Sequence, residues 1–413
     1  MTAFTPKWAV SVNGRGDVTN LVISDLTITS GRSDIYSQPV AGYARFTILN
    51  LNQADVGFDV NDSVVIKVKN SAGTFVPIFG GDVTDIDVTI KTGEPAITQA
   101  ISVTALGALA KLPKTLTEGV LSKAYDGDQI YTILEQVLFD SWDEVPSALT
   151  WASYEPTTTW ANAQNSGVGE IDRPGDYELT ARAANTTDIY SLVSSLAKSG
   201  LGYIYEDSSG RIGYADSTHR SQYLSANGYA SIDGGWAYAN GISTSKRLGD
   251  LRNKVTITYK NSQQESAQSA SSIQTYGMQA ENIQTSIENS ADALSQANFY
   301  LALRAFPQYQ FKSISFPLCN PAIPDASRDA ALGVFMGLPV DIEDLPNNIA
   351  GGRFQGFVEG WTWTSRFNEL DLTITVSPVA YSLQAFRWNS VPVTETWNTL
   401  SPILDWNNAT IVA

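Results

Sequence analysis

The chain has 413 residues, a net charge of −16 and a hydrophobic fraction of 43%. This length exceeds one ordinary core and favours two to four domains, and the composition is that of a folded protein. Cys319 and His219 are the only residues of their types, which excludes a disulfide framework, a cysteine metal cluster and a multi-histidine metal site within one chain. We therefore expect no metal and no cofactor, and the acidic balance argues against DNA binding through phosphates.

Residues 1–118 are predicted to form a first β-barrel domain. In 44–51, 64–70, 75–81 and 97–106, β-branched and aromatic residues alternate with polar ones at the period of a strand. Segments rich in glycine, asparagine and aspartate separate them, as is typical of turns. Antiparallel strands of this kind form a barrel or a sandwich.

Residues 119–246 change character and predict a helical and α+β insert. A helix is expected at 127–138, where the apolar residues lie on one helical face, and a second at 186–202. Residues 202–216 follow as a strand, a polar turn and a strand. A Trp- and Thr-rich segment at 147–167 is too long for a simple connector. The expected caps of the second helix are Thr187 or Asp188 at its start and Gly200 at its end.

Residues 247–382 are predicted to form a second barrel domain that also contains a helix. The helix is expected at 289–307, capped by Asn289 or Ser290 and closed by Pro307. The alternating pattern of strands returns on both sides of it. The expected strands are 254–260, 311–318, 338–345, 352–363 and 369–379.

The two strand-rich parts share a motif, which indicates an internal duplication. The first part contains F-x-G-x-V-x-x-I from Phe79 to Ile86, and the second contains F-x-G-x-V-x-x-W from Phe354 to Trp361. Four matching positions are a weak signal in a β-rich sequence. An alternating strand precedes and follows each motif, however, and this order favours a duplication.

Residues 383–413 are predicted to be an extended C-terminal arm. Trp388, Trp397 and Trp406 are nine residues apart, and prolines between them prevent a continuous helix. Trp is a preferred anchor at interfaces, so the arm is a candidate for docking on an adjacent subunit or another protein. Two other interpretations stay open, namely that the indoles stack on sugars and that the arm packs on its own barrel.

Several acidic residues are candidates for other chemistry. Glu206 with Asp207, or Asp126 with Asp128, could supply the paired carboxylates of a glycosidase, which needs no histidine. Each pair is expected in a polar turn or at a helix start, where acids are common for structural reasons. We therefore predict that the chain is not an enzyme, and we expect His219 on the solvated surface.

Residues 27–50, followed by the strands and turns up to about residue 110, resemble the opening of minor tail proteins of long-tailed bacteriophages. The segment from SADALSQANFYLALRAFP to GRFQGFVEGWTWTSRFNELDLTITVSPV, within 250–382, resembles the later barrel of the same proteins. The family is the tail or baseplate hub. The resemblance implies a mainly β fold with two tail-tube-like antiparallel β-barrel domains and an α+β insert.

The same resemblance implies a structural role at the distal end of the tail tube. A homotrimer with two tube-like barrels per chain would present six units and adapt a sixfold tube to a threefold tip. Its partners would be the distal tail or tail tube ring, the tape-measure protein, and tail tip or fibre proteins used in host cell attachment. DNA would pass through without specific binding during genome ejection, because a negative surface repels phosphates.

The sequence leaves two alternative functions open and also indicates where the protein is located. The alternatives are a hexameric distal tail protein and a glycan-binding tail-tip adhesin. The first residues lack a signal peptide pattern and no segment has the length of a membrane helix. We therefore expect assembly in the host cytoplasm, a place in the virion tail and no membrane anchor.

The segment GRSDIYSQPVAG, which begins at Gly31, is a further candidate for assembly. In a hub it could be a long connection that reaches the neighbouring ring, and an ordinary solvated loop stiffened by proline is an equally good interpretation. The residues proposed to make this contact are Arg32, Asp34, Tyr36 and Pro39.

Overall fold

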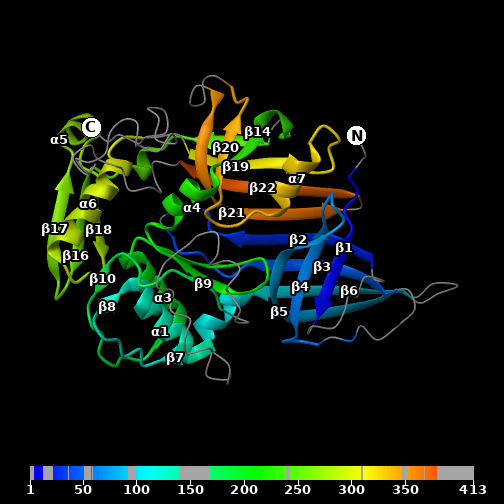
Figure 1. Cartoon of the computed structure of the whole chain (residues 1–413), viewed down its shortest axis with the longest axis horizontal. Coiled ribbons are helices and arrows are strands. Elements are labelled where there is room, and N and C mark those ends of the chain that lie inside the picture. The colour runs from blue at the N-terminus through cyan, green and yellow to red at the C-terminus, as the bar shows by residue number, and fades with distance from the viewer. Residues whose placement is uncertain are drawn as a thin grey trace.

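The computed structural model describes most of the chain and places both predicted β-rich parts in one body (Figure 1). No helix among the described residues is long and apolar enough to cross a membrane. The described residues are 4–12, 22–35, 37–50, 57, 59–91, 98–138, 168–238, 241–307, 310–346, 352–366 and 368–378.

One large sheet contains strands from both predicted barrel regions. In its first half these are β1 Trp8–Val12, β2 Val22–Gly31, β3 Tyr43–Asn50, β4 Ser63–Lys69, β5 Phe75–Lys91 and β6 Thr98–Gly107. In its second half they are β14 Ala230–Asp233, β15 Ile242–Ser245, β19 Gln310–Pro317, β20 Pro339–Glu343, β21 Phe354–Arg366 and β22 Glu369–Pro378. The main path is β1-β4-β5-β6-β3-β2-β21-β22-β19-β15, and β20 and β14 branch from β21 (Figure 1). The predicted mainly β, antiparallel fold is confirmed.

The two halves of the sheet repeat one arrangement. The order β4-β5-β6-β3-β2 in the first half corresponds to β20-β21-β22-β19-β15 in the second. The phenylalanine and glycine of the shared motif lie on β5 and β21, and β-branched residues face them from the neighbouring strand in both halves. These pairs are Ile66 with Phe79, Val64 with Gly81, Ile342 with Phe354 and Val340 with Gly356.

An irregularity also recurs at one place in both halves. The register of β5 on β6 shifts between Val83 and Asp85, and the register of β21 on β22 shifts between Val358 and Gly360. The valine of the motif precedes the shift in each case. A bulge at the same position of both strands is a specific feature of the fold and not a chance irregularity. The pairing therefore supports the predicted duplication.

A seam between β2 and β21 joins the two halves. Leu26 to Gly31 of β2 pair with Ser365 to Gly360 of β21. Gly31 has a φ of +86°, and a Cβ there would collide with the backbone at Glu359, so this close approach requires glycine. The sequence did not predict the seam, which makes the two barrel regions parts of one continuous sheet.

A single hydrophobic core extends through both halves. Phe46 and Ile66 from the first half and Phe316 and Trp363 from the second belong to the same buried cluster. The alternation of the strands explains this core, since buried and half-buried residues alternate along β4. The seam is therefore packed like a protein interior.

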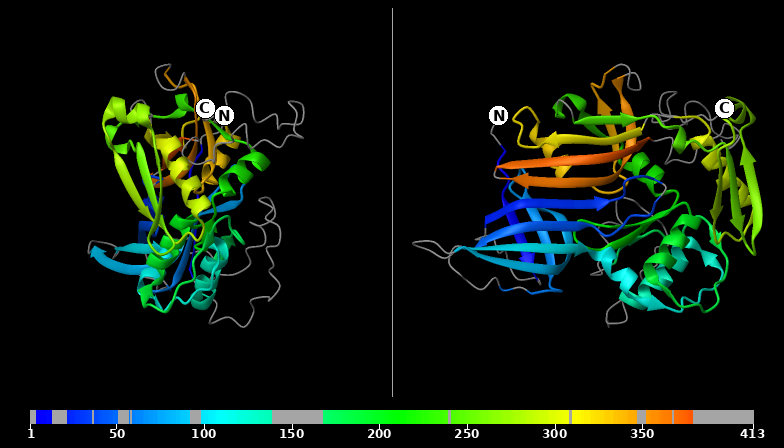
Figure 2. Two further views of the ribbon diagram at one scale, coloured as in Figure 1. Left: turned by 90° about the vertical axis from the view of Figure 1, so that its left-hand side faces the viewer. Right: turned by 180° about the vertical axis from the view of Figure 1, so that it is seen from behind.

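The insert packs its helices against a second core (Figure 2). Its elements are α1 Asp126–Leu138, β9 Val168–Ile171, α3 Ile189–Ser199, β12 Tyr203–Glu206, β13 Ile212–Ala215 and α4 His219–Asn227. Both predicted helices are confirmed, and Asp188 is the cap of α3 because its side chain accepts from the amide of Ser191 at 2.8 Å. Short strands complete the insert: β7 Leu116–Thr117, β8 Ala124–Tyr125, β10 Glu178–Leu179 and β11 Thr187–Asp188.

A small lobe interrupts the second half of the sheet between β15 and β19. It contains β16 Lys254–Tyr259, β17 Gln263–Gln268, α5 Ala270–Tyr276, β18 Ala280–Gln284 and α6 Ser290–Arg304. The strand expected at 254–260 therefore exists, but it pairs with β17 and β18 in a separate sheet. Its Val255 and Ile257 join the core of the insert. Conversely, β14 and β15 come from the predicted insert range and pair in the large sheet, so the domain bounds remain a proposal.

Candidate functional site

The loop after β2 docks on its own chain. Arg32 is buried, and its Nε donates to Glu359 Oε2 at 2.7 Å. The carbonyl of Pro39 accepts from the hydroxyl of Tyr190 at 2.7 Å. Asp34 is exposed, and Tyr36 lies outside the described residues. Two of the four residues proposed to reach a neighbouring ring thus bind their own insert or sheet, and the inter-ring role itself remains a prediction.

Glu359 is the centre of a buried ion cluster that the sequence analysis did not identify. Arg220 of α4 donates from Nη1 to Glu359 Oε1 at 2.7 Å and from Nη2 to Oε2 at 3.0 Å. The hydroxyl of Ser377 also donates to this carboxylate. Burial acts to raise the pKa of Glu359, but the charges of Arg220 and Arg32 outweigh it and lower the pKa to about 2. The cluster connects the β2 loop, the second half of the sheet and the insert.

The candidate glycosidase carboxylates have structural partners. Glu206 ends β12 and accepts from the amides of Gly42 and Leu109, the latter at 3.1 Å. Its burial raises the pKa to about 7, although these amide donors act against the shift. Asp207 accepts from the turn amides that follow it and pairs with Arg211. Glu206 thus joins the insert to the first half of the sheet.

The second candidate pair, Asp126 and Asp128, also has structural partners. Asp126 accepts from the amide of Tyr177 at 2.8 Å and from the hydroxyl of Tyr214. Its burial at the start of α1 raises the pKa to about 7. Asp128 forms an ion pair with Arg173 at 2.8 Å. These contacts fix the first turn of α1 against β13 and the preceding loop, as expected for acids at a helix start.

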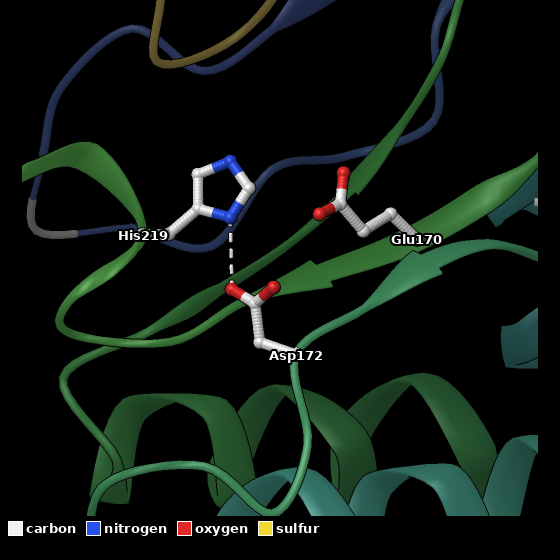
Figure 3. Close-up of side chains that lie close together, drawn as sticks. All are labelled: Glu170, Asp172 and His219. Atoms are coloured by element: carbon white, nitrogen blue, oxygen red, sulfur yellow. Dashed lines mark hydrogen bonds and ion pairs between the residues drawn. The ribbon is translucent and has the colours of Figure 1, made fainter. Parts of the chain in front are cut away.

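The expectation that His219 lies on the solvated surface is wrong. Its side chain is 3% exposed, and its Nδ1 lies 2.8 Å from Asp172 Oδ2. His219 is the first residue of α4, so its imidazole points back toward the end of β9 (Figure 3). Asp172 follows β9 directly, and the polar character of the surrounding segment concealed this burial in the sequence.

The outer part of β5 presents an open edge. Residues 85–91 of β5 pair with β6 on one side, and no described strand pairs with them on the other. The corresponding part of β21 is covered by β2. Val88 and Ile90 are 53% and 58% exposed, whereas Trp363, which corresponds to Val88, is 0% exposed. This part of β5 and β6 extends beyond the rest of the sheet (Figure 1).

A second open edge lies at the other end of the sheet path. β15 pairs with β19 on one side, and no described strand covers its other side. β15 corresponds to β2, whose equivalent edge is paired with β21. An unpaired edge is a template for another strand, and natural proteins normally protect it. Among the described residues, the outer part of β5 and the outer side of β15 therefore have no strand partner, whereas the equivalent edges of β21 and β2 pair with each other.

The tryptophans proposed for docking lie outside the described residues. This applies to Trp388, Trp397 and Trp406 and to the Trp- and Thr-rich segment at 147–167. Their roles remain predictions from the sequence.

Comparisons with known proteins identify the fold. No known family profile matches the sequence, and no curated protein matches it either. Several solved structures do match in three dimensions, across almost the whole chain. All of those described below are tail proteins, with a sequence identity that is too low to show more than a shared fold.

The tail protein from Neisseria meningitidis MC58 is 12% identical and superimposes with a TM-score of 0.58 over 92% of this chain and 98% of that one. The 43 kDa tail protein of prophage MuSo2 from Shewanella oneidensis is 12% identical, with a TM-score of 0.50 over 91% and 98%. Prophage tail protein gp18 from Listeria monocytogenes EGD-e is 10% identical, with a TM-score of 0.50 over 90% and 95%. The chain has the fold of phage tail proteins, which confirms the resemblance seen in the sequence.

Proposed function

We propose that this chain is a structural protein of a phage tail, and that three copies form the hub ring at the distal end of the tail tube. The fold shared with tail proteins supports the general role. The observation that supports a ring of three copies is the duplicated sheet, because two equivalent halves per chain give six equivalent units in a trimer.

The proposed contact between copies repeats the contact that β2 and β21 make within one chain. Inside one copy, β2 of the first half covers the outer part of β21 in the second half. The corresponding partners, β15 and the outer part of β5, lie toward opposite ends of the sheet path. In our proposal β15 of one copy pairs with β5 of the next copy. Such a head-to-tail contact closes into a ring when the rotation between copies permits it.

Apolar residues match across this proposed seam. The register of β2 on β21, carried over to the equivalent strands, places Ile242 opposite Ile90. It also places Thr244 opposite Val88. The contact would bury the two most exposed apolar side chains of the β5 edge, and each contributes about 1 to 2 kcal/mol on burial.

Charges match as well. Asp85 and Asp87 are exposed on the opposite face of the β5 arm, and Arg247 follows β15. The same register places Arg247 opposite Asp85 and diagonal to Asp87. Opposite charges at facing positions of neighbouring strands stabilise the pair and select its register.

The remaining parts of the proposal concern activity and partners. The candidate acids Glu206 and Asp126 are buried, and their hydrogen bonds hold the insert in place. This structural role supports the proposal that the chain is not an enzyme. The ring would stack on the distal tail or tail tube protein, contact the tape-measure protein, and carry tip or fibre proteins below it. Its negative charge favours passage of DNA without binding.

The test combines the copy number with charge reversal at the seam. The isolated chain is analysed by native mass spectrometry and the assembled tail tip by electron microscopy, and we expect a trimer with six sheet lobes in its ring. Asp85→Arg alone and Arg247→Asp alone should each weaken the trimer roughly tenfold, or about 1.4 kcal/mol over three contacts. The double variant, which restores opposite charges, should recover most of the loss. Lys114→Glu, an exposed change at the end of the short 3-10 helix that follows β6, is the control.

Each outcome of this test separates one interpretation from the others. A trimer that is indifferent to Asp85 and Arg247 would keep the hub and overturn the seam. Six copies per ring would move the assignment to the distal tail protein. A monomer retained on host cell walls, in a manner that depends on the three C-terminal tryptophans, would overturn the ring and support the glycan-binding adhesin.

A further inference from the structure

A buried cluster of two carboxylates and one imidazole lies where β9 meets α4. Glu170 is 1% exposed, Asp172 2% and His219 3%. One oxygen or nitrogen atom from each residue lies within 4.8 Å of those from the other two. Figure 3 shows that the carboxylates of Glu170 and Asp172 and the Nδ1 side of the imidazole face a common space.

The hydrogen bonds of Asp172 leave one of its oxygens without a partner. Oδ2 accepts from the amide of Asp216 at 3.0 Å and lies 2.8 Å from His219 Nδ1. Oδ1 is fully buried and has no hydrogen-bond partner in the described part of the chain. A buried carboxylate oxygen without a donor is costly unless a cation neutralises it.

The charge of the cluster also favours a bound cation. Glu170, Asp172 and the nearby Asp216 are three carboxylates beside one histidine. Glu170 and Asp172 are both buried, and His219 is the one basic side chain of the three. Buried acidic groups of this kind either hold protons or coordinate a metal ion.

We propose that Glu170, Asp172 and His219 bind a divalent first-row transition metal ion. Carboxylate oxygen and imidazole nitrogen are ligands that suit zinc and manganese, whereas calcium and magnesium prefer sites made of oxygen alone. Two ligands of a tetrahedral ion on bonds of about 2.05 Å are about 3.3 Å apart. The 2.8 Å between Asp172 Oδ2 and His219 Nδ1 is a hydrogen-bond distance, and it would open by about 0.5 Å when the metal replaces the proton of Nδ1.

The ion would hold the insert to the sheet junction. His219 begins α4, and the next residue, Arg220, donates to Glu359 of β21. A metal bound to β9 and to the first residue of α4 would fix this turn and hence the direction of Arg220. Metal binding would then stabilise the folded chain, because no such site exists in the unfolded state.

The competing state is a metal-free ion pair. In that state the proton of His219 Nδ1 is hydrogen-bonded to Asp172 Oδ2 at 2.8 Å. A protonated imidazole beside Asp172, with a proton on Glu170, would also neutralise the cluster. The two states differ in one observable: His219 Nδ1 carries a proton in the ion pair and none in the metal complex.

The experiment uses the full chain without a polyhistidine tag. Metal analysis after equilibration with Zn²⁺ or Mn²⁺ and dialysis should give one ion per chain, and none with Ca²⁺. Glu170→Gln should weaken Zn²⁺ binding more than tenfold, whereas Cys319→Ser, which removes the single thiol, should leave it unchanged. A chelator should lower the melting temperature of the wild-type chain but not that of Glu170→Gln.

A second measurement holds even if Glu170→Gln does not fold. His219 is the single histidine, so its ¹⁵N-labelled imidazole gives one side-chain signal that needs no further assignment. We expect Nδ1 to lose its proton and shift when Zn²⁺ is added. An unchanged imidazole signal, a melting temperature indifferent to chelator and no retained ion would overturn the metal site and leave the ion pair.

Discussion

The two halves of the large sheet differ in one respect that matters for assembly. Both have the same strand order, the same pairs at the motif and the same register shift. In the second half, the outer part of β21 is covered by β2, and its Trp361 and Trp363 are buried. In the first half, the corresponding residues are Ile86, which is only partly buried, and Val88, which is 53% exposed on an open edge. This difference between the two halves is the basis of the contact that we propose between copies.

The sharpest way to test this comparison is to truncate equivalent side chains in the two halves. Trp363 fills the core at the seam, so Trp363→Ala should lower the free energy of unfolding by about 4 kcal/mol. Val88→Ala at the equivalent position should cost less than about 0.5 kcal/mol in the isolated chain. Urea unfolding of both variants under conditions that keep the chain monomeric measures the difference. Similar losses would show that the β5 edge is buried without a partner copy.

Removal of Glu359 should break the connection between the halves and the insert. Glu359→Gln leaves Arg32 and Arg220 buried without a countercharge, and we expect a loss of about 3 kcal/mol. Because the folded-state pKa is lowered to about 2, the stabilisation is present above the unfolded value of about 4.5 and is lost as the pH falls toward 2. Acid unfolding of wild type and variant should therefore converge at low pH. Glu343→Gln, an exposed change on β20, is the control.

The seam within the chain depends on a glycine that the proposed seam between chains does not share. Gly31 has a positive φ and meets the backbone at Gly360. Gly31→Ala should cost about 2 kcal/mol, because the left-handed conformation and the close approach both oppose a Cβ. Thermal unfolding measures this loss. Gly249→Ala, where the added Cβ meets open space, should change the stability by no more than a few tenths of a kcal/mol.

The sequence was sufficient to predict the elements and the duplication. Period-two alternation located the strands, and the apolar face and Asp188 located α3, because these signals are local. It did not reveal that β2 reaches β21, since pairing between residues more than 300 apart leaves no periodic trace. It also placed 254–260 in a barrel, because a strand pattern does not specify which sheet the strand joins.

The buried polar residues were harder to predict, for a related reason. Glu359 is an acid within the otherwise apolar run GFVEGW, and that contrast was the available signal for the ion cluster. His219 and Asp172 lie in polar segments that are typical of the surface, and contacts between segments distant in the chain bury them. One cysteine and one histidine exclude cysteine clusters and multi-histidine sites, but not a site with one imidazole and two carboxylates.

Glu206 provides the smallest expected loss of stability on substitution and a test of how the insert is joined to the first half. In the unfolded chain a glutamate titrates near 4.5, whereas burial raises the pKa of Glu206 to about 7 in the folded chain. Between these values the folded chain keeps a proton that the unfolded chain has lost. The stability contributed by this group is therefore complete below about pH 4.5 and falls as the pH rises to about 7. A pKa raised from 4.5 to about 7 corresponds to a fall of about 3 kcal/mol across this range.

Glu206→Gln should remove that fall, because the amide does not titrate and its oxygen can still accept from Leu109 or Gly42. Urea unfolding at several pH values from 4.5 to 8 measures both profiles, and Asp126, whose pKa is also raised, affects them equally. Glu118→Gln, an exposed change, should leave the wild-type slope intact. Parallel profiles for wild type and Glu206→Gln would mean that the two amide donors keep Glu206 ionised, and that the junction of the insert with the first half is held by a charge, as Glu359 holds the second.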